Sequence, residues 1–192
     1  MLEGGGMTAA ERLVRYEDLF DLPDNVVGEI IAGRLYTHPR PAPAHTRASS
    51  VLGNKVGTPF DQGEGGGPGG WWILDEPELH LSENVLVPDL AGWRRERMPA
   101  LPKTAWFEMA PDWVCEVLSP ATARTDRVLK LPRYAAAGVA HCWLIDPDIR
   151  TLEAYANQDD RWLLLGTWGG DDVANIDPFA ALPLSLAGLW VD

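Results

Sequence analysis

Short apolar runs separated by turns recur along most of the chain, which is the pattern of a sheet-forming protein. The segments that predict strands are 26–31, 34–36, 71–74, 78–81, 85–94, 113–118, 140–145, 151–155 and 161–168. Two other segments, 44–56 and 124–137, predict helices, and Gly138 follows the second where a C-terminal glycine is common. The glycine-rich stretch 61–70 predicts a flexible loop inside the domain.

The N-terminal part of the chain predicts one more helix. Thr8 and Glu11 match a capping box, so we expect a helix that starts there and ends near Phe20. Residues 1–7 are expected to form a disordered leader. Residues 8–192 are expected to form a single domain, because this length suits one hydrophobic core.

The order of the predicted elements indicates how the sheet is connected. A helix at 124–137 joins the strands 113–118 and 140–145, and such a crossover implies that the two strands are parallel. We therefore predict an α/β fold of the mixed-sheet (α+β) kind, with a central mixed β-sheet flanked by helices. The extra N-terminal helix and several C-terminal strands would be added to this core.

Composition excludes some classes of protein. Hydrophobic residues make up 46% of the chain, yet no run of about 18 apolar residues occurs, so we expect no membrane partner. The first residues lack the basic region and apolar stretch of a signal peptide. Cys115 and Cys142 lie inside apolar runs, which favours buried thiols in a reducing cytoplasm over a disulfide.

The net charge of −12 argues against non-specific binding to nucleic acid, for which a basic surface supplies the affinity. The charge is uneven, because residues 89–133 hold eight basic and six acidic residues. An anionic substrate met at this segment agrees with the charge, whereas a long DNA footprint over the whole surface does not.

Two carboxylates in this segment fall on apolar runs where burial is expected. Asp89 follows Val87 and Pro88, and Glu116 lies in the middle of 113–118. Alternation along neighbouring strands would bring both acids to one face. A divalent cation would keep both ionised, and oxygen ligands suit Mg²⁺ or Mn²⁺. The alternative is that Asp89 is a turn residue and Glu116 forms a buried ion pair.

Lys130 is the third candidate. It lies four residues after Asp126 and four before Tyr134, so the three share one face of the predicted helix. Lys130 either forms an ordinary ion pair along the helix or reaches over Glu116 to hold a water molecule and stabilise charge. Pro132 removes a helix hydrogen bond, so we expect a kink or an irregular turn close by.

Glu29 alternates with apolar residues and is either a site residue or a solvent-facing residue at a sheet edge. His45 opens the helix at 44–56 and is either part of its cap region or a site residue. Ser119 lacks a His/Asp partner pattern, which argues against a serine hydrolase. Residues 63–70 lack the Lys-Ser/Thr of a P-loop, which argues against a phosphate-binding loop of that type. The remaining histidines show no metal-ligand spacing: His38, His80 and His141.

With these residues in place, the chain resembles the Uma-type restriction endonucleases, a branch of the PD-(D/E)XK nuclease superfamily. The resemblance extends from about residue 14 to 190. Its most specific piece is PDWVCEVLSP at 111–120. Other matching pieces are EIIAGRLY at 29–36, PAPAH at 41–45, VPD at 87–89, and CWLIDP at 142–147, with Asp126, Lys130, Tyr134 and Gly138 between the last two.

The resemblance implies a restriction-endonuclease-like fold and Mg²⁺- or Mn²⁺-dependent cleavage of DNA by a homodimer. Asp89 and Glu116 would bind the metal, and Glu29 would assist. Superfamily enzymes commonly have a lysine at the position of Leu118, so this branch points instead to Lys130 on the following helix. Two alternatives stay open: a non-catalytic binding protein that keeps the fold, and a hydrolase of small phosphoesters.

Overall fold

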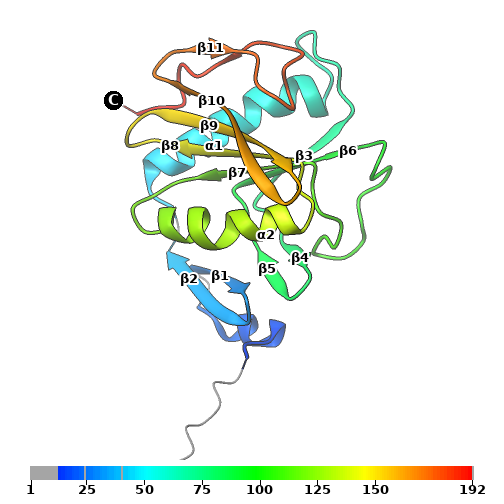
Figure 1. Ribbon diagram of the computed structural model, residues 1–192, viewed down its shortest axis with the longest axis vertical. Helices are drawn as coiled ribbons and strands as arrows, with labels where there is room; N and C mark the ends of the chain where they lie inside the picture. Colours follow the sequence, from blue (N-terminus) through cyan, green and yellow to red (C-terminus); the bar gives the residue numbers. More distant parts are fainter. Residues whose placement is uncertain (1–12, 24, 40, 192) are drawn as a thin grey trace, which may run out of the picture.

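A six-stranded mixed sheet forms the centre of the computed structural model, which describes residues 13–23, 25–39 and 41–191 (Figure 1). Its strands, in spatial order, are β10 Arg161–Gly169, β9 Thr151–Gln158, β8 His141–Asp146, β7 Trp113–Val117, β6 Leu90–Arg94 and β3 Trp71–Asp75. The β7–β8 pair is parallel and the other pairs are antiparallel. The predicted crossover and the mixed α/β fold are thereby confirmed.

Two smaller sheets lie outside this centre. Four strands form the larger of them, in the order β2 Arg34–Pro39, β1 Val26–Ile31, β5 Asn84–Leu86 and β4 Leu79–Leu81. Near the C-terminus, β11 Val173–Ala174 pairs with β12 Leu184–Ser185. In Figure 1 the β1–β2 hairpin extends below the helix α2, away from the C-terminal strands.

Helical segments cover both faces of the six-stranded sheet. The helix α1, Pro43–Val56, continues into the short π-helical segment η2, Gly57–Asp61. On the other face, η3, Thr125–Lys130, runs directly into α2, Leu131–Ala136. The sheet therefore separates two apolar cores, and the four-stranded sheet contributes Ile31, Leu79 and Leu86 to the core on the α2 side.

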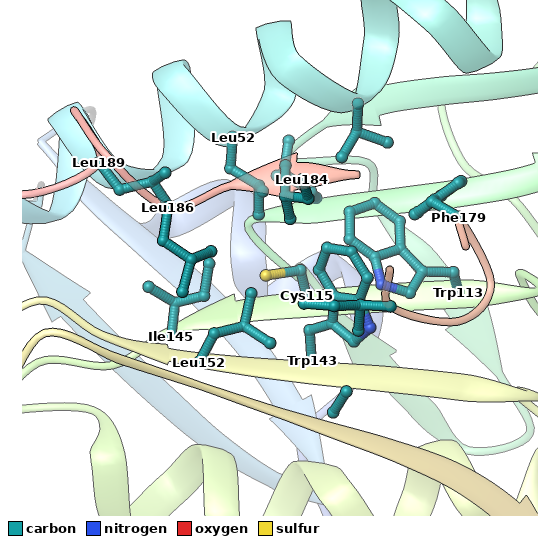
Figure 2. Close-up of a cluster of buried hydrophobic side chains, with 14 of the residues drawn as sticks. Leu52, Trp113, Cys115, Trp143, Ile145, Leu152, Phe179, Leu184, Leu186 and Leu189 are labelled. Carbon is teal, nitrogen blue, oxygen red and sulfur yellow. The ribbon is translucent and has the colours of Figure 1, made fainter. Parts of the chain in front are cut away.

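Aromatic side chains fill the core on the α1 side (Figure 2). Leu52 of α1 packs into the same cluster as Trp113 of β7 and Trp143 of β8, and all three side chains are fully buried. The ring of Phe179 packs edge-on against both tryptophans, at 5.0 and 5.6 Å between centroids. This contact anchors the C-terminal segment over the sheet.

The helix predicted at 124–137 is present but is widened in its first half. The amide of Leu131 donates to the carbonyl of Asp126, five residues earlier, as in a π-helix. Pro132 has no amide hydrogen to add to the usual ladder, so the irregular turn expected near it is confirmed. Despite the wider turn, Asp126, Lys130 and Tyr134 are all buried on the side that faces the sheet.

Two predicted elements differ from the structure. The predicted strand 85–94 is two strands, β5 and β6, which belong to different sheets. Pro88 has no amide to donate, and the amide of Val87 donates to the carboxylate of Glu29 at 2.7 Å instead of to a neighbouring strand. Asp89 therefore lies in the connection between β5 and β6.

The second difference is at the N-terminus, where the structure has a 3₁₀ helix, η1 Tyr16–Asp21, in place of an α-helix that reaches Phe20. The predicted leader and the capping residues Thr8 and Glu11 lie outside the described residues. No described helix is long and apolar enough to span a lipid bilayer.

Replacing Leu52 by alanine tests the core on the α1 side. Leu52 is fully buried, so Leu52→Ala should lower the free energy of unfolding by about 2–5 kcal/mol, measured by urea denaturation. Leu101→Ala is the matched control, because Leu101 is exposed and its truncation should change stability by less than about 0.5 kcal/mol. Equal effects of the two substitutions would contradict this packing.

Candidate active site

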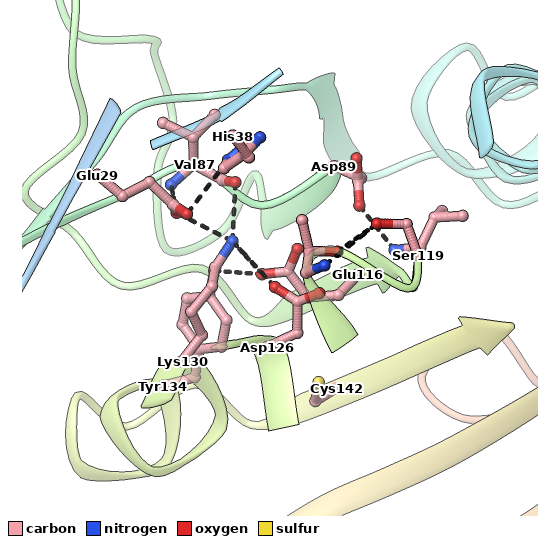
Figure 3. Close-up of polar contacts among 12 residues, drawn as sticks. Glu29, His38, Val87, Asp89, Glu116, Ser119, Asp126, Lys130, Tyr134 and Cys142 are labelled. Carbon is pink, nitrogen blue, oxygen red and sulfur yellow. Dashed lines mark hydrogen bonds and ion pairs between the residues drawn. The ribbon is translucent and has the colours of Figure 1, made fainter. Parts of the chain in front are cut away.

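A cavity of about 280 Å³ opens where the β5–β6 connection passes the end of β7 and the start of η3. Three of the predicted site residues line it: Asp89, Glu116 and Lys130. The fourth, Glu29, contacts Lys130 from β1. The structure therefore brings together the four residues singled out in the sequence, which come from three strand regions and one helix (Figure 3).

Lys130 is the centre of this arrangement. Its Nζ lies 2.8 Å from Glu116 Oε1, 2.9 Å from Glu29 Oε1 and 3.0 Å from the carbonyl oxygen of Val87. An ammonium group has three protons to donate, and these three acceptors match that number. Asp126 adds a looser ionic contact at 3.8 Å, beyond hydrogen-bond distance.

The surrounding carboxylates hold Lys130 in its charged form. Burial by itself would lower the pKa of the ammonium, but Glu116, Glu29 and Asp126 together raise the pKa well above its ordinary value. For Glu29, burial would raise the pKa, but Lys130, His38 and the Val87 amide lower it to about 2. Lys130 and Glu29 are therefore an ion pair over the whole physiological range.

Glu116 is in a different electrostatic situation, although Lys130 also contacts it. Burial raises the pKa of its carboxyl group well above the usual range, and the negative charges of Asp126, Asp89 and Glu29 raise it further against the effect of Lys130. Burial likewise raises the pKa of Asp126 to about 6. A cation bound in the cavity would favour the ionised form of Glu116 against this effect of burial.

Two further groups fix the carboxylate of Glu116. The hydroxyl of Tyr134, from α2, donates to Glu116 Oε1 at 2.6 Å, and both side chains are almost fully buried. Lys130 donates to the same oxygen. Charge-assisted hydrogen bonds of this kind are short and strong, so the carboxylate has one orientation in the site.

Asp89 is held by groups from two other elements. The amide of Val117 donates to Asp89 Oδ2 at 2.6 Å, and His45 Nε2 lies 3.2 Å from Asp89 Oδ1. His45 comes from the first turn of α1. Burial by itself would lower the pKa of His45, but the carboxylates of Asp89 and Asp126 raise it.

Sequence reasoning missed two residues of the site. Asp126 is buried, lines the cavity and lies beside Lys130, although the sequence suggested only an ordinary contact along the helix. His38 also lines the cavity, and its Nε2 lies 3.5 Å from Glu29 Oε2. No spacing signal could have identified His38, because its contact arises from the β1–β2 pairing.

Leu118 occupies the position where the resemblance described above would lead one to expect a lysine, and its side chain is buried in the apolar core on the α2 side. The Leu118 amide donates to the carbonyl of Ile145 at 2.7 Å, which ties it to β8. The ammonium group beside Glu116 comes instead from Lys130, as the sequence indicated.

The donor groups fit a hard cation that needs few protein ligands. Among the described residues, no group of three or more His, Cys, Asp and Glu side chains is arranged to hold a metal ion. Asp89 and Glu116 line one cavity, and two further acidic residues, Glu76 and Asp126, also line it. Mg²⁺ is commonly bound by one or two carboxylates, with water and substrate phosphates as its other ligands.

The substitution Lys130→Met tests the charge balance of the site. It would leave buried carboxylates without their cation and should lower the free energy of unfolding by about 3–5 kcal/mol at pH 8. In the wild-type protein, the depressed pKa of Glu29 stabilises the fold above about pH 4.5, and this contribution is lost toward pH 2.

In the Lys130→Met variant, burial would raise the pKa of both Glu29 and Glu116, so the variant loses stability as the pH rises. The stability difference from wild type should therefore be smaller at pH 5 than at pH 8, as measured by urea denaturation at both pH values. Lys103→Met, at an exposed lysine, is the control. A pH-independent difference would contradict the proposed charge balance.

The comparisons with known proteins agree with this fold. Residues 15–187 match the family described as "Uma2: Putative restriction endonuclease". A crystal structure of a protein from Anabaena variabilis, described as a "putative nuclease", superposes with a TM-score of 0.72 at 23% sequence identity. The superposition covers 90% of this chain and 95% of that one. A comparison with curated proteins found no match. Because the family match spans most of the sequence, this chain belongs to the Uma2 family.

Proposed function

We propose that this protein is an endonuclease that hydrolyses phosphodiester bonds in DNA with the help of Mg²⁺ or Mn²⁺. The observation that carries the proposal is the cavity shared by Asp89 and Glu116, with the Lys130 ammonium 2.8 Å from Glu116. Two carboxylates that can hold a divalent cation, beside a fixed positive charge, can supply the groups used in metal-assisted phosphodiester hydrolysis. The description of the Uma2 family supports the same reaction class.

Asp89 and Glu116 would hold the cation through their carboxylate oxygens. When bound, the cation would polarise a phosphoryl oxygen and make a water molecule more acidic. In the overall reaction, the oxygen of water forms a bond to phosphorus, one ester P–O bond breaks, and the leaving oxygen takes up a proton.

Lys130 would act as a fixed positive charge. Its pKa is raised well above the ordinary value by the three carboxylates around it, so the ammonium does not serve as a proton acceptor. A positive charge held in a buried position can stabilise the negative charge that builds up on the phosphate oxygens during hydrolysis, without having to reorganise. We therefore assign Lys130 an electrostatic and positioning role.

Glu29 would assist indirectly. It is 1% exposed, it does not line the cavity, and its contacts are with Lys130, His38 and the Val87 amide. The ion pair with Glu29 helps to hold the ammonium group of Lys130 beside Glu116. The role we propose for Glu29 is to position Lys130, with no direct contact to the substrate.

A DNA substrate has to be reconciled with the net charge of −12. A protein this acidic cannot rely on broad phosphate contacts for affinity, because such contacts need a basic surface. Binding would instead be local and would depend on the cation, which bridges the carboxylates and a phosphate group. We expect DNA affinity to be low without a divalent cation.

We further propose that the protein is a cytoplasmic homodimer. Two copies of the single site would be needed to cut both strands of a duplex at one place. The open edge strand β10 supports self-association, because Leu163, Leu164 and Leu165 are exposed on it. Sedimentation velocity should then give twice the mass of one 21.1 kDa chain, and a monomeric mass would refute this part of the proposal.

The buried free thiols of Cys115 and Cys142 suit a reducing compartment.

Replacing Glu116 by glutamine tests the proposed function. Glu116→Gln removes one carboxylate but keeps the size of the side chain and its contact with Tyr134. Cleavage of plasmid DNA in Mg²⁺ or Mn²⁺ should fall at least about 100-fold, in line with the loss of a metal ligand. Glu83→Gln, at an exposed position, is the matched control and should cleave like wild type.

Three results would contradict the proposal or redirect it. Wild-type cleavage by folded Glu116→Gln would refute the mechanism. Absence of cleavage of duplex DNA, single-stranded DNA and RNA by the wild-type protein would favour a non-catalytic binding protein that keeps the nuclease fold. Hydrolysis of bis-nitrophenyl phosphate without cleavage of polynucleotides would favour a small-phosphoester hydrolase.

A further inference from the structure

His45 lies at the edge of the cavity, beside the carboxylate of Asp89. It is the third residue of α1, and its side chain is 11% exposed at the edge of the cavity. Its Nε2 lies 3.2 Å from Asp89 Oδ1, and the Asp89 side chain is itself only 15% exposed. This contact therefore lies largely away from bulk solvent.

Asp89 depends on side-chain contacts for its orientation. It lies in the connection between β5 and β6 and follows Pro88, which has no amide hydrogen. One of its carboxylate oxygens accepts from the Val117 amide at 2.6 Å, and the other faces His45. Together the two contacts fix both oxygens, one from the sheet and one from α1.

The second ring nitrogen indicates why the histidine is there. His45 Nδ1 is buried and has no hydrogen-bond partner in the part of the chain that the structure describes. Buried polar atoms are normally paired, so a hydrogen bond of Nδ1 does not account for the position of the ring. The contact of Nε2 with Asp89 does account for it.

We propose that His45 is a positioning residue, whose Nε2–H donates to Asp89 Oδ1 and thereby holds the carboxylate in the orientation that faces the cavity shared with Glu116. The consequence for catalysis rests on the proposed nuclease function. The hydrogen bond itself does not, so it can be tested separately. Residues that orient a metal ligand in this way typically contribute 10–100-fold to metal affinity or activity.

Two near-isosteric substitutions distinguish this role from a general packing role. The amide nitrogen of glutamine can occupy the place of the histidine Nε2, so His45→Gln keeps the donor to Asp89. The amide of asparagine corresponds instead to Nδ1, so His45→Asn keeps a polar side chain but loses this donor. His45→Leu removes both nitrogens and keeps the bulk.

The first readout is the NMR signal of the Val117 amide proton, which needs neither metal nor DNA. The short hydrogen bond to Asp89 Oδ2, at 2.6 Å, should shift this proton downfield in the wild-type protein. The downfield shift should persist in His45→Gln and be lost in His45→Asn, His45→Leu and Asp89→Ala. An unchanged Val117 signal in His45→Leu, or equal loss in His45→Gln and His45→Leu, would overturn the proposal.

The second readout is DNA cleavage. In His45→Leu and His45→Asn, kcat should fall about 10–100-fold and the Mn²⁺ concentration for half-maximal cleavage should rise, while His45→Gln stays within about threefold of wild type. Wild-type kcat in His45→Leu would overturn the proposal. If the wild-type protein cleaves nothing, the proposed nuclease function fails, and the Val117 signal alone decides the role of His45.

Discussion

The buried ammonium of Lys130 is the interaction on which the rest of the site depends. Its acceptors come from β1, from the β5–β6 connection and from β7, so one side chain joins the four-stranded sheet to the six-stranded sheet. An unpaired charge would be very unfavourable in this position. The contacts with Glu29 and Glu116 offset that penalty, and the Val87 carbonyl accepts the remaining proton. The three hydrogen bonds of the Lys130 ammonium therefore hold β1, the β5–β6 connection and β7 in place around the cavity.

This constraint also explains where the site has its excess of negative charge. Glu29 and Lys130 neutralise each other, whereas burial raises the pKa of Glu116 and Asp126, and the charges of neighbouring carboxylates raise both further. Strongly shifted pKa values of this kind cluster at functional sites. Asp89 completes the arrangement from a connection freed from strand pairing, since the Val87 amide binds Glu29. The contacts of Glu29 with Val87 and Lys130 therefore stabilise the fold and also shape the proposed site.

Much of this could be predicted from the sequence, and the exceptions have physical causes. The parallel β7–β8 pair followed from the strand–helix–strand order of the apolar segments. Asp89 and Glu116 followed from charged side chains on apolar runs, and Lys130 from its helical spacing with Asp126 and Tyr134 and from the family resemblance. The only local signal of the break after Leu86 is Pro88, which disfavours a strand at that point, because the apolar residues around it continue the strand pattern and do not reveal a change of sheet. The contribution of His38 depends on strand pairing across a turn, and that of His45 on the packing of α1 against the sheet. Long-range contacts of this kind leave no local pattern.

The most direct test of this interpretation is calorimetric titration of Mn²⁺ into the wild-type protein and into Asp89→Asn, with and without a short DNA duplex. If the cavity is a cation site, wild-type protein should bind one divalent ion per chain, more tightly when DNA is present. The affinity should fall at least about tenfold in Asp89→Asn. Absence of binding to wild type under both conditions, or equal binding to the variant, would contradict a cation site at Asp89 and Glu116.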